Sequence, residues 1–220
     1  MKKINYYEVP TFNGQSSYTK YYSDWDDWLL PSTFKRVYNA DDADFLIFTG
    51  GADVDPIFYN ENSNSYTSSC IARDNYEAEV FAKYVNKKPF VGYCRGAQFL
   101  TVMSGGKLIQ HFSGHSSPHN MITDQGIIQV NSTHHQMMFP YNMDDNSYLI
   151  LGGCMPLPES QHLGGEDTLM PLPTNFVEPE AVFYPKSKAI GFQFHPEWDS
   201  CPKEGKDWSR QQILKHLFNK

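Results

Sequence analysis

The chain has 220 residues, 40% of them hydrophobic and 15% aromatic, with 25 acidic and 18 basic residues. This apolar content excludes a disordered chain, and the length predicts one domain over residues 1–220. A formal net charge of −7 without a run of Lys and Arg lacks the pattern of a nucleic-acid-binding protein. We therefore expect no direct contact with nucleic acid, whereas a small-molecule substrate stays open.

The N-terminus lacks the apolar core of a secretory signal, and no stretch approaches the roughly 18 apolar residues of a membrane-spanning helix. We therefore expect a cytoplasmic protein that does not enter a membrane. The four cysteines, Cys70, Cys94, Cys154 and Cys201, are too few for a disulfide scaffold. We predict reduced thiols, although their even number leaves one or two disulfides open.

Apolar runs and turn residues predict the elements of the first half of the chain. In order, these are a strand at 2–9, a short helix around Tyr21 to Leu29, buried strands at Phe45–Phe48 and Phe90–Tyr93, and two longer helices. The first longer helix carries the apolar stripe Ala78, Phe81, Ala82 and Val85. The second covers residues 97–103 and ends at a Ser-Gly-Gly sequence.

The second half of the chain has more β character. Strands are predicted at 126–131 and 189–194, with 181–184 pairing beside the latter, and a helix at Trp208–Phe218. Residues 152–180 are rich in Pro and Gly, which predicts a long irregular excursion. Because strands and helices alternate in the middle of the chain, we predict an α/β fold whose mostly parallel sheet has helices on both faces.

The most informative segment is Gly92–Gly96, of sequence Gly-Tyr-Cys-Arg-Gly, where a buried strand is predicted to turn into a helix. A nucleophile at such a turn is presented at the carboxyl edge of the sheet, and glycines on either side let backbone and helix pack closely. The N–H groups that open the helix favour a thiolate and an oxyanion. This pattern indicates that Cys94 is a nucleophile.

A thiol nucleophile needs a base, and the base needs a group that orients it. His195 and Glu197 follow the last predicted strand and lie two residues apart, so on an extended backbone both project to one face. The strand end places them at the sheet edge where ligands bind in open α/β folds. Although His-x-Glu alone is a weak signal, beside Cys94 it is the best available base and orienting carboxylate.

These segments resemble the class I glutamine amidotransferase-like superfamily. Three others are similar to its γ-glutamyl hydrolase branch, peptidase family C26: Gly50–Pro56, the Arg-Asp-x-x-Glu of Arg73–Glu77, and the Val-Asn-Ser-x-His-His-Gln of Val130–Gln136. The resemblance implies a flavodoxin-like α/β fold with a Cys-His-Glu triad. It also implies an oxyanion hole made by the backbone N–H groups of Gly51 and Arg95.

By the same resemblance, Gln98, His134, His135 and Arg73 would contact the substrate. Gln98 and the two histidines have plainer alternatives, an exposed helical Gln and a packed turn with one structural His, and Arg73 would pair with a substrate carboxylate. Asp74 and Glu77 are explained by helix capping, so we do not place them in the site. Adjacent histidines are poor ligands for one ion, and no Cys/His spacing suggests zinc, so we expect no metal and no cofactor.

The resemblance implies that Cys94 attacks a γ-glutamyl amide to form a thioester, with His195 as acid and base and Glu197 holding its tautomer. The substrate would be an N-substituted glutamine or glutamine itself. Two alternatives stay open: a glutaminase subunit that supplies ammonia to a separate synthetase partner, and a binding protein without catalysis. A homo-oligomer is equally open. The short segment before Phe45 and the excursion at 152–180 depart from the family where substrate specificity is shaped.

Overall fold

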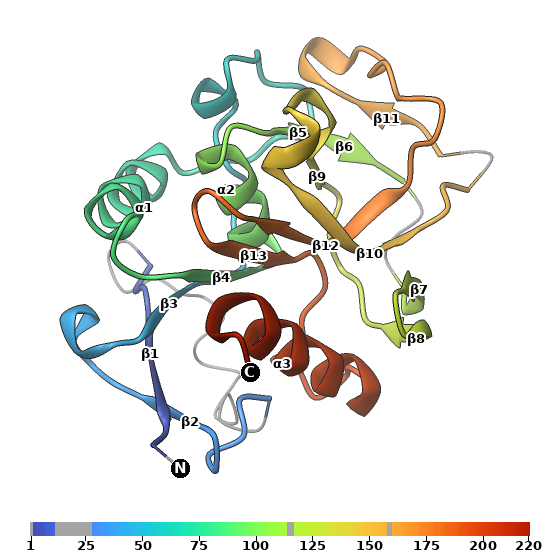
Figure 1. Ribbon diagram of the computed structural model, residues 1–220. Helices are drawn as coiled ribbons and strands as arrows, with labels where there is room; N and C mark the ends of the chain where they lie inside the picture. Colours follow the sequence, from blue (N-terminus) through green and yellow to red (C-terminus); the bar gives the residue numbers. More distant parts are fainter. Residues whose placement is uncertain (1, 12–27, 114–116, 158–159) are drawn as a thin grey trace.

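The computed structural model describes residues 2–11, 28–113, 117–157 and 160–220. A twisted sheet forms its centre, with helices packed on both faces (Figure 1). The helices are α1 (Ile71–Tyr84), α2 (Arg95–Met103) and α3 (Lys203–Phe218). The strands are β1 (Ile4–Glu8), β2 (Phe34–Arg36), β3 (Phe45–Phe48), β4 (Phe90–Tyr93), β5 (Lys107–Ile109), β6 (His111–Phe112), β7 (His119–Thr123), β8 (Gly126–Val130), β9 (Met137–Phe139), β10 (Leu149–Cys154), β11 (His162–Leu163), β12 (Glu178–Tyr184) and β13 (Ala189–Phe192).

The main sheet has nine strands in the order β2-β1-β3-β4-β13-β12-β10-β7-β8. The strands from β2 to β13 pair in parallel, whereas those from β13 to β8 pair antiparallel. Continuous apolar sequence explains the central position of β3, in which no side chain is more than 2% exposed. The predicted α/β, flavodoxin-like fold class is confirmed, and an antiparallel extension is added to it.

Two apolar clusters cover the two faces of the parallel strands. On one face, Phe45 and Phe192 pack with Trp208 and Ile213 of α3. On the other, Phe48 and Phe90 pack with residues of α1 and α2, among them Phe81 and Phe99. Alternate residues of one strand therefore enter different clusters, as the two-residue repeat of a strand requires.

The structure confirms most predicted strands and corrects the first long helix. Because α1 begins at Ile71, after Cys70, Asp74 lies inside its first turn, and the capping interpretation is wrong. The buried face of α1 carries charged Arg73, Asp74 and Glu77, whereas Ala82 of the predicted stripe is exposed. The short helix predicted around Tyr21 lies almost wholly outside the described residues.

The predicted excursion at 152–180 is ordered at both ends. Its first residues belong to β10 and its last to β12, and the described residues between them form irregular chain with only the short strand β11 and a 3-10 turn. The C-terminal helix begins at Lys203, five residues before the predicted start at Trp208.

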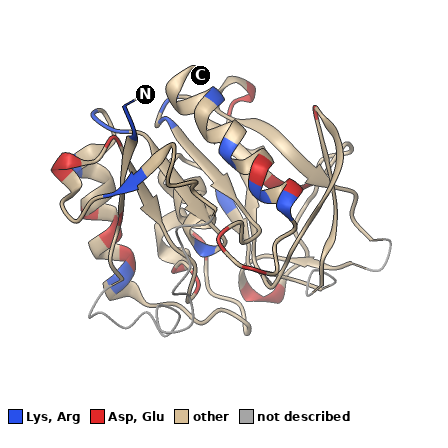
Figure 2. Ribbon diagram, turned by 90° about the horizontal axis from the view of Figure 1, so that it is seen from below, with Lys and Arg blue, Asp and Glu red and all other residues tan. Residues whose placement is uncertain are grey.

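Charges of both signs occur along α1 and α3 (Figure 2). In α3, Asp207 pairs with Lys203 at 2.5 Å and also with Arg210. Among the described residues, no helix combines the length and apolarity needed to cross a bilayer.

The two glycines around Cys94 are required by close packing. A Cβ at Gly92 would overlap the carbonyl of Gly96, and a Cβ at Gly96 would overlap the carbonyl oxygen of Phe48 at the end of β3. The helix α2 can therefore begin directly against the sheet only when both side chains are hydrogen atoms.

We predict that Gly96→Ala destabilises the protein by about 1–3 kcal/mol, because α2 must move away from β3. In an ordinary helix the same change stabilises by about 1 kcal/mol, so the sign of the effect is diagnostic. Urea unfolding measures it, with Gly126→Ala as the control, because a Cβ there meets no atom within 4 Å and only the φ of +110° is strained. An unchanged or raised stability of Gly96→Ala would contradict the close packing.

Candidate active site

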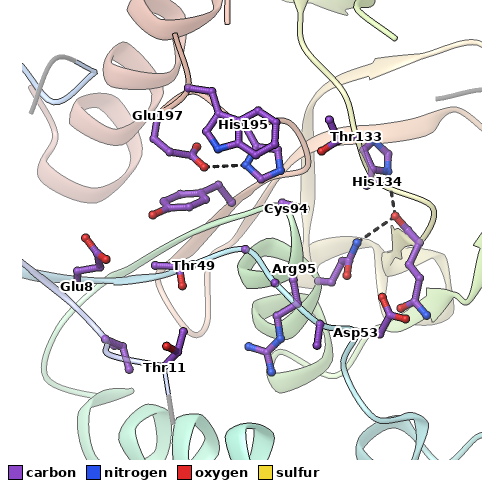
Figure 3. A pocket seen from close by; sticks show the side chains of 18 of the residues that line it. Glu8, Thr11, Thr49, Asp53, Cys94, Arg95, Thr133, His134, His195 and Glu197 are labelled. Atoms are coloured by element: carbon purple, nitrogen blue, oxygen red, sulfur yellow. Dashed lines mark hydrogen bonds and ion pairs between the residues drawn. The ribbon is translucent and has the colours of Figure 1, made fainter. Parts of the chain in front are cut away.

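A pocket of about 490 Å³ opens at the carboxyl ends of β1, β3 and β4. The loop after β3, the turn after β4 and the segment after β13 supply Thr49–Asp53, Cys94, and His195 with Glu197. The segment Thr133–Gln136 closes one side (Figure 3). The structure thus brings together residues that lie far apart in the sequence, at the edge where parallel sheets bind ligands.

Cys94 lies in a strained turn between β4 and α2. Its φ of 52° and ψ of −117° are unusual for a residue with a side chain. The chain is held there by a hydrogen bond of 2.8 Å from the Cys94 N–H to the carbonyl of Phe192 on β13. As a result, the thiol projects into the pocket ahead of the first turn of α2 (Figure 3).

His195 faces Cys94 and is held from three directions. Its Nδ1 lies 2.7 Å from Oε1 of Glu197. Its ring stacks on Trp198 at a centroid distance of 3.8 Å. The side-chain amide of Asn131 accepts from the His195 N–H at 3.0 Å and donates to its carbonyl at 3.1 Å. Since Nδ1 is engaged by the carboxylate, Nε2 is left for the thiol.

The pKa of His195 lies well above its usual range. Burial opposes the charged imidazolium, but the neighbouring Cys94 and Glu197 favour it more strongly through charge and hydrogen bonding. The imidazole thus lies between the Cys94 side chain and the buried carboxylate of Glu197.

Four buried charged side chains lie beneath this turn. Arg95, which is 1% exposed, pairs with Asp74 and Glu77 of α1. Arg73 binds Glu77 at 2.8 Å and donates to the carbonyls of Gly50 at 3.0 Å and Thr49 at 2.9 Å. Arg73 thus lies behind the loop and outside the pocket lining, where it holds the backbone rather than facing a substrate.

The two predicted oxyanion-hole residues flank Cys94. As the first residue of α2, Arg95 has an N–H without an acceptor inside the helix, while its side chain points away from the pocket (Figure 3). Gly51 has a φ of 137°, and a Cβ there would overlap the guanidinium of Arg73. Glycine at this position therefore lets the loop lie close to both Arg73 and the pocket.

Gln98, His134 and His135, which the sequence analysis expected to contact the substrate, all line the pocket. Gln98 is 2% exposed and donates to the carbonyl of Gln136 at 3.0 Å, and His134 engages the same carbonyl at 2.9 Å (Figure 3). His135 lies 3.2 Å from a carboxylate oxygen of Asp53, and this hydrogen bond raises the pKa of His135 despite partial burial.

Sequence reasoning missed several residues that line the pocket or hold its residues in place. Asp53 and Asn131 lie inside recognised motifs, so their motif positions were an available signal. Trp198 follows His195 by three residues and stacks on it. Glu8 and Arg36 pair at 3.3 Å on the opposite side of the pocket. Glu8 is the last residue of β1, and its position at the carboxyl end of a parallel strand could have indicated a pocket residue, since ligands bind at that edge of the sheet.

Comparison with known proteins gives consistent results. The sequence model of the family described as Peptidase C26 matches residues 32–138. A Lactococcus lactis protein provisionally named glutamine amidotransferase-like is 42% identical over 76 residues, which are 34% of this chain and 32% of that protein. The protein NtpR of Enterococcus hirae is 34% identical over 86 residues, 37% of this chain and 36% of NtpR. The aligned part thus spans about a third of these relatives' lengths.

Solved structures share the fold over nearly the whole chain. A Thermoplasma acidophilum protein, provisionally named as part of a GMP synthase, superposes with a TM-score of 0.58 at 18% identity and covers 97% of this chain and 94% of its own. A glutamine amidotransferase of Thermotoga maritima gives a TM-score of 0.54 at 13% identity, covering 98% and 84%.

We predict that the His195 ring titrates above pH 6.5 and that Glu197→Gln lowers its pKa, because the carboxylate favours the imidazolium. A folded-state pKa above the unfolded value gives stability that is fully present below about pH 6.5 and lost as the pH rises through the folded pKa. The unfolding free energies of the two proteins should therefore converge as the pH is raised. NMR of the ring nitrogens measures the pKa, and titration at or below pH 6.5 in the unaltered protein would contradict the assignment.

Proposed function

The chain belongs to the class I glutamine amidotransferase-like superfamily, and from this premise we propose that it is a cysteine-dependent enzyme that hydrolyses γ-glutamyl amides. The observation that carries the proposal is the arrangement of Cys94, His195 and Glu197, which we call the Cys94 triad, in one pocket with the thiol at a helix N-terminus. At about 490 Å³, the pocket has the size of a small-molecule site.

The reaction begins with attack of the Cys94 sulfur on the γ-carbonyl carbon of the substrate. The C–N bond breaks as His195 gives its proton to the leaving amine, which leaves a glutamyl thioester on Cys94. His195 then removes a proton from water, the resulting hydroxide attacks the thioester, and the sulfur leaves as thiolate. The products are glutamate and the free amine. Glu197 stabilises the imidazolium in both steps.

Oxyanion stabilisation comes from the backbone N–H groups of Gly51 and Arg95. Both groups belong to segments held by the buried charges: Arg73 binds the carbonyls of Thr49 and Gly50, and Arg95 is anchored to α1. Preorganised donors of this kind need no rearrangement as negative charge develops on the carbonyl oxygen. We therefore assign Arg73 as a positioning residue instead of a substrate ligand.

The glutamyl end of the substrate would lie against Gln98, His134 and His135. His135, whose pKa is raised by its hydrogen bond to Asp53, offers a partner for a carboxylate, while Asp53 and Gln98 offer acceptors for an amino group. The opposite side of the pocket, with Glu8, is left for the leaving amine. An N-substituted glutamine is thus the preferred substrate class.

A second candidate function is release of ammonia from glutamine for an acceptor on a synthetase partner. It is favoured by the names of the relatives, which include glutamine amidotransferase-like proteins and part of a GMP synthase. The same triad chemistry would apply, with ammonia as the leaving group.

We predict that Cys94→Ala lowers glutamate release from γ-glutamyl amides at least about 1,000-fold, because the nucleophile is lost. Cys70→Ala is the control, since its thiol is exposed at the start of α1. A panel of γ-glutamyl amines, γ-glutamyl peptides and free glutamine separates the two functions. Activity on glutamine alone, and only with a partner present, would reject the hydrolase.

Diazo-oxo-norleucine should modify Cys94 in a manner that requires His195, as mass spectrometry would show.

We predict that Arg73→Lys lowers kcat about 10- to 100-fold with little change in KM, because a lysine cannot hold both loop carbonyls as the planar guanidinium does. Steady-state kinetics on a cleaved γ-glutamyl amide measures both constants. If Arg73 instead bound the substrate carboxylate, the variant would raise KM and leave kcat near its original value. That outcome would restore the role predicted from the sequence.

A further inference from the structure

A second group of Cys, His and Glu side chains lies on the antiparallel part of the sheet. His119 begins β7, Cys154 ends β10 and Glu180 lies on β12, and these three strands are neighbours (Figure 1). The three side chains, which we call the strand cluster, place their ligand atoms within 4.8 Å of one another. We propose that the strand cluster binds a divalent transition-metal ion of the zinc type.

The distances fit one ion between these atoms. Nε2 of His119 lies 3.2 Å from Oε1 of Glu180, and Sγ of Cys154 lies 3.9 Å from the same oxygen. Tetrahedral zinc, with bonds of about 2.0 Å to N and O and 2.3 Å to S, separates N from O by about 3.3 Å and S from O by about 3.5 Å. The two distances that involve the Glu180 oxygen are therefore within a few tenths of an ångström of those in a tetrahedral site.

His134 lies beside the strand cluster. Its Nε2 lies 3.7 Å from Oε1 of Glu180, and its Nδ1 lies 2.9 Å from the carbonyl of Gln136. Since a carbonyl can only accept, Nδ1 carries a proton and donates this hydrogen bond. Hydrogen bonding of the distal ring nitrogen to a backbone carbonyl is the arrangement that orients metal-bound histidines.

A second carboxylate supports the strand cluster from behind. Glu178 and Glu180 are both fully buried and lie two positions apart on β12, hence on one face of the strand. Glu178 lies 3.6 Å from Sγ of Cys154 and binds Nε2 of His162 at 2.7 Å. Buried carboxylates beside a thiol make the location favourable for a cation.

The donor types select the metal. Thiolate and imidazole favour zinc and similar transition metals, whereas Mg²⁺ and Ca²⁺ prefer oxygen ligands alone. Binding requires Cys154 to lose its proton to solvent, so affinity should fall as the pH is lowered. Because three adjacent strands hold the donors, the site is rigid, and through His134 it borders the active-site pocket.

The test uses the full chain, stripped of metal with a chelator and titrated with Zn²⁺ and, separately, Co²⁺. We expect one ion per chain and a near-ultraviolet thiolate-to-cobalt absorption band. Cys154→Ser and Glu180→Gln should each weaken binding by at least about 10- to 100-fold, and Cys154→Ser should abolish the band. Elemental analysis gives the stoichiometry.

Cys94→Ser is the matched control, because the Cys94 triad is also a Cys, His and Glu set. It should keep both the ion and the band. Zn²⁺ should also protect Cys154 of the unaltered protein from alkylation by iodoacetamide, which peptide mass spectrometry resolves even if Cys154→Ser fails to fold. Absence of a thiolate band in the unaltered protein, or its loss in Cys94→Ser instead of Cys154→Ser, would overturn the proposal.

Discussion

The ion pairs that join Arg95 to Asp74 and Glu77 decide where the active-site turn lies. Arg95 is the first residue of α2, and its guanidinium is buried against α1. Removing one partner of such a buried pair typically costs about 3–5 kcal/mol, because the remaining charge is left uncompensated. The turn at Cys94 is thus anchored by charge on the helix side and by the hydrogen bond to Phe192 on the sheet side.

The same group of buried charges also holds the loop of Gly51, the other half of the candidate oxyanion hole. Glu77 orients Arg73, and Arg73 binds the carbonyls that precede Gly51. One carboxylate therefore lies between two arginines, and each arginine fixes a segment that lines the pocket. This explains why α1, which supplies none of the pocket-lining residues, has a charged buried face.

How much of the fold and the site could be predicted from the sequence depended on how far apart in the sequence the interacting residues lie. Local patterns predicted β3, β4 and α2, because continuous apolar runs and a Gly-x-Cys-x-Gly turn carry their own signal. The resemblance placed Cys94, His195 and Glu197 in one site. The role of Asp74 was missed because its partner is 21 residues away in sequence and buried, and a capping motif gave a sufficient local explanation. The contacts of Arg73 with the loop were missed for the same reason, since its acceptors are backbone carbonyls, which leave no pattern.

The strand cluster could not be found from spacing, since its donors come from three strands and lie tens of residues apart. Comparing it with the Cys94 triad shows why two similar residue sets favour different chemistry. The triad thiol lies on a turn at a helix N-terminus, open to a pocket, with the carboxylate behind the imidazole. In the strand cluster, the imidazole and the thiol both point at one carboxylate oxygen. A linear arrangement of thiol, imidazole and carboxylate suits proton transfer. Side chains whose ligand atoms converge on one point suit the binding of an ion.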